Sequence, residues 1–426
     1  MNLYPSPHAD RRLRVCTLCV GVLIALLLLA LLLGGGSFSK AQLQSTVEEE
    51  VAGAVRHMNY EAGDTYQVTI QASDSADLLA ASRGLLSSVR IESTFHTRDG
   101  ASRSTAAQHL SGAGVIYRLN KDLGEAYILT NYHVVYLAEA VTEGGISDNI
   151  RLFLYGMESR DYAIAATFVG GSPYYDIAVL KVSGSPLLRA SSAVAAAFAD
   201  SDEISVLETA IAIGNPAAGG ISATVGHVNV DRERITMSLV TDERKKVDMR
   251  VVRIDTAVNS GNSGGGLFNA RGEIIGIVNA KVADQGIENI GYAIPANVAK
   301  NIAENILYYC DGTNKTRVYR CMLGIKVEAA TSTTVYDTQT GRVGIREQVK
   351  ITSVQPTAPV AGELRAGDIL TAIRIGDTEK SITRTFHIID FMLTARVGDT
   401  VTVTFLRDGT RHTATFTITE QALTAY

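Results

Sequence analysis

Short apolar runs separated by glycine and other turn residues fill most of the chain from Leu85 onwards, and they limit the architectures open to it. Many short strands joined by turns are typical of β-sandwiches and β-barrels. The 38 glycines fit such a turn-rich protein. We therefore predict a mainly β fold, and 426 residues suggest two or three domains. The predicted strands are 88–92, 114–119, 126–130, 150–155, 163–169, 177–182, 209–213, 223–229, 247–254 and 274–280.

Two serines, Ser260 and Ser263, lie within the glycine-rich stretch 259–266, NSGNSGGG, shortly after an apolar strand-like run at 251–255. Glycine lets the backbone turn tightly and approach a ligand closely. A serine nucleophile needs such a tight turn around it, because backbone N–H groups must point at the oxyanion that forms when the serine attacks a carbonyl group. We predict Ser263 as the nucleophile and the N–H groups of Gly261 and Ser263 as the oxyanion hole. Taken alone, the stretch also fits an ordinary glycine turn.

A histidine and an aspartate stand at the ends of two other apolar runs. His133 closes the run 127–135, and Asp176 opens the run 175–182. A histidine can take the proton of a serine hydroxyl, and a carboxylate can fix the tautomer of the imidazole ring. The chain order His133, Asp176, Ser263 is that of chymotrypsin-type proteases. The alternatives are a buried core histidine and an aspartate in a turn.

The blocks TNYHVV, DIAVLKV and NSGNSGG, with AIGNP at 212–216 and GYAIP at 291–295, resemble the HtrA/Deg family of serine proteases over residues 84–420. The resemblance implies a chymotrypsin-like fold of two six-stranded barrels, with the triad in the cleft between them. It also implies small aliphatic residues before the cleaved bond and no cofactor or metal. The chain departs from many relatives at Ala113 and Gly266, where they have serine and proline.

The C-terminal part, from a predicted joint near 310–320, resembles a circularly permuted PDZ domain. A helix is predicted at 296–307 before the joint and another at 384–395. Asp408-Gly409 predicts a hairpin turn. The resemblance implies that C-terminal peptides add as a strand, with their carboxylate held by the N–H groups of Leu323, Gly324 and Ile325. The alternative is a small β-rich packing domain that binds nothing.

The N-terminus carries an uncharged apolar run at 15–33 after the basic segment 1–14. Nineteen helical residues span about 28 Å, close to the thickness of the hydrocarbon core. We predict a single transmembrane helix with a cytoplasmic N-terminus, because arginines precede it. A cleaved signal peptide is the alternative. Residues 34–84 are assigned to a juxtamembrane linker, in which a helix is predicted from Ser45. The protease domain is placed at 85–310 and the PDZ domain at 311–426.

Composition excludes several functions. The net charge is −5 and the pI about 5.9, so no excess of basic residues points to nucleic acid. No Walker A run or HExxH motif is found.

Cys16 and Cys19 lie inside the apolar run, where a metal or redox role is not expected. Cys310 and Cys321 are either a disulfide or two unpaired core thiols. The charged segments 231–234 and 242–246 are predicted as solvated faces, with regulatory loops as the alternative.

Together these features predict a membrane-tethered, extracytoplasmic serine endopeptidase that cleaves unfolded or misfolded proteins in envelope quality control. The PDZ domain would recognise exposed C-termini. The resemblance also implies a homotrimer built through the protease domain. Two alternatives share the same motifs: a regulatory protease with one dedicated client, and an inactive protease that serves as a chaperone or peptide-binding scaffold.

Overall fold

The computed structural model describes residues 76–98, 105–280, 290–313, 315–339 and 341–426. The described residues all belong to one compact unit, Ser75–Tyr426, which is the second of two units in the chain. The predictions of a cytoplasmic segment at 1–14, of a transmembrane helix at 15–33 and of a helix from Ser45 lie outside the described residues, as do Cys16, Cys19 and residues 34–75 of the predicted linker 34–84. Within the described ranges, no helix has the length and apolar character needed to cross a membrane.

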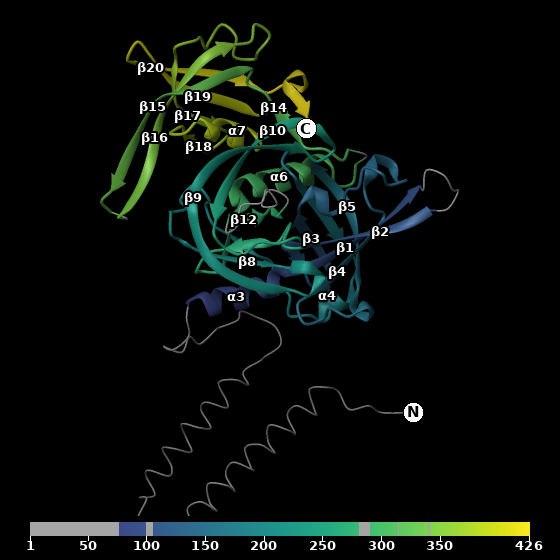
Figure 1. Ribbon diagram of the computed structural model, residues 1–426. Helices are drawn as coiled ribbons and strands as arrows, with labels where there is room; N and C mark the ends of the chain where they lie inside the picture. The colour runs from purple at the N-terminus through teal and green to yellow at the C-terminus, as the bar shows by residue number, and fades with distance from the viewer. Residues whose placement is uncertain (1–75, 99–104, 281–289, 314, 340) are drawn as a thin grey trace, which may run out of the picture. The chain divides into compact units, whose positions relative to one another are not determined.

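The first part of the second unit is a closed barrel with strand order β1-β2-β3-β6-β5-β4 (Figure 1). All neighbours in it are antiparallel. Its apolar side chains alternate along the strands and meet in the barrel interior, which forms one hydrophobic cluster. The strands are β1 (Ser88–Arg98), β2 (Thr105–Asn120), β3 (Glu125–Thr130), β4 (Asn149–Leu154), β5 (Ile164–Ser172) and β6 (Ile177–Val182).

The second sheet has the order β11-β8-β9-β10-β13-β12-β7, and a further β11–β12 pairing closes six of these strands into a ring. Strand β7 adds to β12 in parallel outside the ring. The two six-stranded rings agree with the predicted double barrel, and each of the ten predicted strands overlaps an observed one. The strands are β7 (Ala197–Phe198), β8 (Thr209–Gly214), β9 (Ser222–Leu239), β10 (Asp242–Ile254), β11 (Gly266–Phe268), β12 (Glu273–Val278) and β13 (Gly291–Pro295).

Two helices pack on this second barrel. Helix α3 (Ala76–Ser87) contacts β8, β9 and β11. It was not predicted, because residues 61–83 have a polar, ambiguous pattern. Helix α6 (Ala296–Tyr309) agrees with the predicted helix at 296–307 and follows the last strand of the barrel directly. Its buried side chains Val298, Ile302 and Ile306 recur every four residues, which is the spacing that keeps one helix face on a core.

The C-terminal part is a separate antiparallel sheet with the order β15-β16-β17-β19-β20, and β18 pairs with β17. The predicted hairpin turn is confirmed, since Asp408 and Gly409 both have positive φ, 51° and 80°. The predicted helix at 384–395 is shorter than expected. The elements are β14 (Tyr319–Cys321), β15 (Ile325–Asp337), β16 (Arg342–Val354), β17 (Ile369–Ile375), β18 (Thr378–Ser381), α7 (Phe386–Met392), β19 (Thr400–Arg407), β20 (Thr410–Thr417) and β21 (Leu423–Ala425).

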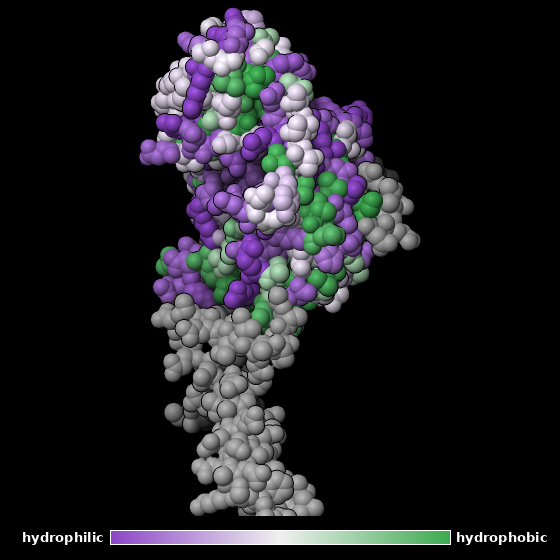
Figure 2. All heavy atoms as spheres, turned by 90° about the vertical axis from the view of Figure 1, so that its left-hand side faces the viewer, coloured by the Kyte–Doolittle hydropathy of each residue, from purple (hydrophilic) through white to green (hydrophobic). Residues whose placement is uncertain are grey.

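Strand β15 lies at the edge of this sheet, because β16 is its only pairing strand in the described part of the chain. The β15–β16 hairpin projects from the sheet (Figure 1). Figure 2 looks onto that side, where hydrophilic residues surround separate hydrophobic patches. An edge strand with free backbone N–H and C=O groups is the part of a sheet that can accept another strand.

The prediction of a solvated face at 231–234 is wrong for Arg232. Residues 231–234 and 242–246 lie in the β9–β10 hairpin, and the Arg232 side chain is only 11% exposed. It donates to the carbonyl oxygen of Asp202 and lies over the ring of Phe386, the first residue of helix α7 in the C-terminal part. The local charge pattern could not predict the burial of Arg232, because the groups that cover it come from distant segments of the chain. The segment 242–246 keeps exposed cations, as predicted, at Arg244 and Lys245.

The two described cysteines are buried and unpaired. Cys310 Sγ donates to the carbonyl oxygen of Arg317 at 3.3 Å, and Cys321 Sγ to that of Ala395 at 3.7 Å. Burial raises the pKa of each thiol to about 11. Of the two alternatives from the sequence, the structure has the pair of unpaired core thiols.

Candidate active site

Asp176 is the most tightly held side chain of the candidate site. It is fully buried at the start of β6 and has a positive φ of 52°, an uncommon conformation for a residue with a Cβ. Its Oδ1 accepts from the backbone N–H of His133 at 3.0 Å, and its Oδ2 contacts His133 Nδ1 at 2.7 Å. Asn279 Nδ2 also donates to Oδ2, at 2.9 Å. Both carboxylate oxygens are therefore satisfied, and the orientation of the imidazole ring is fixed.

His133 lies on a one-turn 3₁₀ helix, Tyr132–Val134, directly after β3. Asn131 precedes it and donates through Nδ2 to the carbonyl oxygen of Asp176 at 2.7 Å. The His133 side chain is 21% exposed, whereas that of Asp176 is 0% exposed. Because Nδ1 faces the carboxylate, Nε2 is the ring nitrogen left for chemistry.

Ser263 lies in the turn between β10 and β11, against the first barrel. Its carbonyl oxygen accepts from Ala113 N at 2.8 Å. Its Oγ accepts from Ala280 N at 3.3 Å, and no hydrogen bond joins Oγ to the His133 ring among the described residues. The adjacent residues Asn279 and Ala280 therefore bridge the site, since one binds Asp176 and the other binds Ser263.

The glycines around Ser263 are required by close backbone contacts. Gly261 has a φ of 100°, and a Cβ there would lie 2.0 Å from the carbonyl oxygen of Asn215. Gly264 has a φ of 83°, and its Cβ would lie 2.2 Å from Thr130 Oγ1. Asn215 N donates to the Gly261 carbonyl oxygen at 3.1 Å. In the described part of the chain, the N–H groups of Gly261 and Ser263 donate to no protein group, as expected of two amides that await an oxyanion.

Three site residues were not predicted from the sequence: Asn131, Asn279 and Ala280. Asn131 belongs to the TNYHVV block and could have been found there as a neighbour of His133. Asn279 follows the last residue of β12, in a position that resembles any polar residue at a strand end. Only the approach of β12 to β6 brings its amide to Asp176.

The predicted carboxylate-binding residues lie where β14 leads into β15. Gly324 has a φ of 69°, and its carbonyl oxygen accepts from Gln355 N at 2.8 Å. Leu323 is buried, and Ile325 is the first residue of the edge strand β15. Within the described ranges, the N–H groups of Leu323 and Gly324 have no partner. The three residues therefore lie together, and two of their amides are unpaired.

A cavity of about 730 Å³ lies beside this loop, between β15, helix α7 and the β9–β10 hairpin of the second barrel. Its apolar lining includes Ile325, Val327, Phe386 and Ile389, and several arginines and carboxylates surround these side chains. A concave, partly apolar space beside a free strand edge has the features of a peptide groove.

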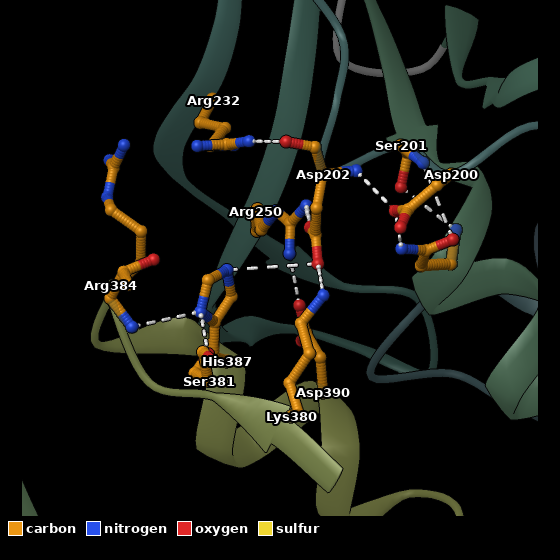
Figure 3. A network of polar contacts seen from close by, with 12 residues as sticks. Asp200, Ser201, Asp202, Arg232, Arg250, Lys380, Ser381, Arg384, His387 and Asp390 are labelled. Atoms are coloured by element: carbon orange, nitrogen blue, oxygen red, sulfur yellow. Dashed lines mark hydrogen bonds and ion pairs between the residues drawn. The ribbon is translucent and has the colours of Figure 1, made fainter. Parts of the chain in front are cut away.

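A group of charged side chains adjoins the cavity, and four of its members, Arg232, Arg250, Arg384 and Asp390, line it. We call this group the arginine cluster: Asp202, Arg232, Arg250, Lys380, Arg384, His387 and Asp390. Figure 3 shows Arg250 between Asp202 of the protease part and Asp390 of helix α7. Asp202 contacts Arg250 Nη2 at 2.8 Å and Lys380 Nζ at 2.6 Å. The cluster therefore joins the second barrel to the C-terminal sheet by buried ion pairs.

Burial and charge shift the titrations in the arginine cluster. Burial acts to raise the pKa of Asp202, but Arg250 and Lys380 outweigh it and hold that pKa well below its usual range. Burial raises the pKa of Asp390 to about 6 and lowers the pKa of His387 to about 4. At neutral pH the cluster therefore contains two carboxylates and an uncharged imidazole.

Comparison with known proteins agrees with this fold. Residues 112–277 match the trypsin-like peptidase domain family, and residues 321–418 match the PDZ domain family. A serine protease Do-like HtrA of Lactococcus lactis is 32% identical over 334 residues, which cover 76% of this chain and 74% of that protein. A serine protease Do-like HtrA of Bacillus subtilis is 34% identical over 70% of this chain and 61% of that protein.

Solved structures give the same result. The HtrA-type protease AlgW with a tripeptide is 26% identical, with a TM-score of 0.52, over 82% of this chain and 98% of that one. The fold and the matched domains define a trypsin-like serine protease that carries a PDZ domain. More particularly, the chain belongs to the HtrA family of Do-like serine proteases.

Proposed function

We propose that the chain cleaves peptide bonds by acyl transfer to Ser263, with His133 as general base and Asp176 as the group that orients it. In the first step Ser263 Oγ bonds to the substrate carbonyl carbon while His133 Nε2 takes the hydroxyl proton. The imidazolium then gives this proton to the leaving amine as the C–N bond breaks. Water, activated by the same nitrogen, hydrolyses the ester.

The observation that carries this proposal is the bridge between the three side chains. Asp176 Oδ2 contacts both His133 Nδ1 and Asn279 Nδ2, and the next residue, Ala280, binds Ser263 Oγ. We infer that Ser263 turns about its Cα–Cβ bond from Ala280 N towards His133 Nε2 when substrate binds. The unpaired amides of Gly261 and Ser263 then receive the oxyanion, a contribution worth about 10² to 10³ in rate for a single donor in related sites.

An active-site-directed fluorophosphonate tests the nucleophile. We expect it to label the full chain at Ser263 and to block cleavage of fluorescent casein. Ser263→Ala is expected to lose labelling and cleavage, whereas Ser260→Ala, a change at an exposed serine of the same turn, is expected to keep both. Labelling that persists in Ser263→Ala at the wild-type rate would reject the assignment.

We propose that the C-terminal sheet binds the C-terminus of a peptide as an added strand along β15. The free edge of β15, the unpaired amides of Leu323 and Gly324 and the adjacent cavity support this. The similar AlgW structure carries a tripeptide. On this reading residues 85–310 form the protease domain and 311–426 the PDZ domain. Isothermal titration of the full chain with peptides that end in an aliphatic residue tests it, and equal affinity for amidated peptides would contradict it.

The remaining proposals concern setting and substrates. We propose that residues 15–33 anchor the chain in a membrane, that the enzyme removes misfolded proteins outside the cytoplasm, and that it works as a homotrimer. The apolar run and the preceding arginines support the anchor, and the family supports the other two. Protease protection of membrane vesicles tests the orientation, and sedimentation of the detergent-purified chain tests the trimer. A monomer at micromolar concentration would contradict the latter.

A further inference from the structure

Glu158 is a carboxylate that bridges the two barrels. It lies in the connection between β4 and β5 of the first barrel, and its side chain is 25% exposed. Both of its oxygens accept from the backbone N–H of Ile221, at 3.2 and 3.1 Å. Ile221 is buried and directly precedes β9 of the second barrel. Glu158 belongs to none of the sequence blocks that carry the candidate catalytic residues, yet this contact joins it to the loop beside the catalytic turn.

Arg90 of β1 holds Glu158 in place. Its Nη2 donates to the backbone carbonyl oxygen of Glu158 at 2.8 Å, and its Nε lies 3.8 Å from Oε2. The guanidinium carbon lies 3.9 Å from the centre of the Phe153 ring, and the Arg90 side chain is only 11% exposed. Side chains that are packed and paired in this way have a fixed rotamer. Glu158 therefore presents its carboxylate to the second barrel from a rigid part of the first.

The loop at 215–221, which this carboxylate contacts, has an unfavourable backbone conformation. Ala217 and Ala218 have φ values of 53° and 56°, in the left-handed region that residues with a Cβ rarely adopt. Such a conformation persists only where the surrounding structure holds it. At one end of the loop, Asn215 Nδ2 donates to the hydroxyl of Ser111 in the first barrel at 2.7 Å. The carboxylate between β4 and β5 holds the other end.

This loop sets the direction of one amide of the proposed oxyanion hole. Ala217 N donates to the Ser260 carbonyl oxygen at 2.9 Å, and Asn215 N donates to that of Gly261 at 3.1 Å. In a planar trans peptide the carbonyl oxygen of Ser260 and the N–H of Gly261 point in opposite directions. The bond from Ala217 therefore fixes the side to which the Gly261 N–H points. If the loop relaxed, this peptide plane could rotate and take the donor away while Ser263 stayed in place.

We propose that Glu158 is a positioning residue for the oxyanion hole, an inference that rests on the acyl transfer proposed above. Glu158 holds the loop at 215–221, and the loop holds the Gly261 amide in the direction that the reaction needs. This amide stabilises charge that develops only in the transition state. Loss of the contact from Glu158 to Ile221 therefore slows the reaction without weakening the binding of substrate.

Kinetics and inhibition of the full chain test the proposal together. The substrate is an internally quenched peptide taken from a casein site that the wild-type chain cleaves, and it gives kcat and KM. The inhibitor is the peptide boronic acid of the same sequence, whose tetrahedral adduct with Ser263 places an oxygen in the oxyanion hole. Its Ki therefore reports on that hole, whereas KM reports on the rest of the site. Titration with a fluorophosphonate counts the folded, reactive sites.

We expect Glu158→Ala to lower kcat per reactive site about 10- to 100-fold, approaching the loss of one oxyanion donor, and to raise Ki by a similar factor. KM should stay within about twofold of the wild-type value. Glu158→Gln keeps an acceptor of the same reach and should recover most of the rate. Glu92→Ala is the matched control, because Glu92 also accepts from Arg90, at 2.6 Å, but has no hydrogen bond to the loop among the described residues. It should change none of the three values.

The outcomes separate this inference from the function on which it rests. A merely structural role for Glu158 would reduce the number of reactive sites and leave kcat per site and Ki unchanged, which would overturn the proposal. If the wild-type chain neither cleaves casein nor reacts with the fluorophosphonate, the proposed protease activity itself fails. Glu158→Asp gives the test if Glu158→Ala does not fold, because it keeps the charge beside Arg90 but is too short to reach Ile221. Wild-type kcat and Ki in Glu158→Asp would overturn the proposal.

Discussion

Two regions of this enzyme differ in how completely their charged groups are paired. At Asp176 both carboxylate oxygens accept hydrogen bonds, from His133 and Asn279. Around the cavity, in contrast, the buried Nε groups of Arg250 and Arg320 have no hydrogen-bond partner among the described residues. A carboxylate with both oxygens paired is fixed before substrate arrives, whereas a buried donor without an acceptor gains free energy when a ligand supplies one. We therefore expect changes at Asp176 to act on the reaction, and changes around the cavity to act on stability and binding.

The largest effect is expected from removing the charge that orients the histidine. Asp176→Asn keeps the shape but presents the wrong group to His133 Nδ1, and we expect kcat to fall about 10⁴-fold, as in sites of the same design. Casein cleavage by the purified full chain measures this, and circular dichroism checks the fold. Asp161→Asn, at an exposed aspartate, is the matched control. A loss of less than about tenfold in Asp176→Asn would contradict the assigned role.

The next largest effect is expected at the centre of the arginine cluster. Arg250→Met leaves the buried carboxylates of Asp202 and Asp390 without their shared cation, and breaking a buried pair typically costs about 3–5 kcal/mol. Urea unfolding at pH 7 measures the loss. Arg271→Met is the control, because it removes an exposed pair with Glu273 that is worth less than about 1 kcal/mol. If the two variants lose equal stability, the cluster does not join the two sheets as described.

The cluster should also make stability depend on pH through His387. Burial lowers the pKa of His387 to about 4, against about 6.5 in an unfolded chain. The folded state therefore binds fewer protons than the unfolded one, and this contribution is complete above pH 6.5 and is lost as the pH falls towards 4. The full difference between these two pKa values corresponds to about 3 kcal/mol of unfolding free energy.

The comparison of His387→Gln with the wild-type chain isolates that contribution. Other groups near the imidazole, namely Asp202, Lys380, Arg250 and Arg232, stay in both proteins. We expect the loss of unfolding free energy between pH 7 and pH 4 to be about 2–3 kcal/mol smaller in the variant. Parallel pH profiles for the two proteins would show that His387 titrates alike in the folded and the unfolded chain, which would contradict this prediction.

The smallest effect, and the one that sharpens the comparison most, is expected at Asn279. It does not touch substrate but donates to Asp176 Oδ2, so we regard it as a positioning residue. Asn279→Ala should lower kcat about tenfold, leave KM unchanged and shift the pH at which kcat/KM is half-maximal. Asn279→Ser, which keeps a donor, should restore part of the rate. Asn269→Ala, at a buried asparagine that binds Glu273, should leave the pH profile unchanged.

Much of the candidate active site was predictable from the sequence, because its residues lie in short segments with a distinctive local pattern. His133 and Asp176 lie next to strand ends, Ser263 lies in a glycine-rich turn, and the glycines at 261 and 264 mark positions that no Cβ can occupy. Helix α3 was missed because its polar pattern has no clear period. Asn279 was missed because its partner, Asp176, lies more than one hundred positions away in the chain.

The sequence alone determined the strands, the order of the three catalytic blocks and the turn glycines, because these depend on side-chain alternation and on backbone conformation within a few residues. Only the tertiary structure decided that Arg232 is buried, that Asn279 binds Asp176 and that Glu158 bridges the two barrels. Whether a charge is paired depends on groups that folding brings together from distant segments. A local sequence pattern cannot predict which of these groups will lie close to one another.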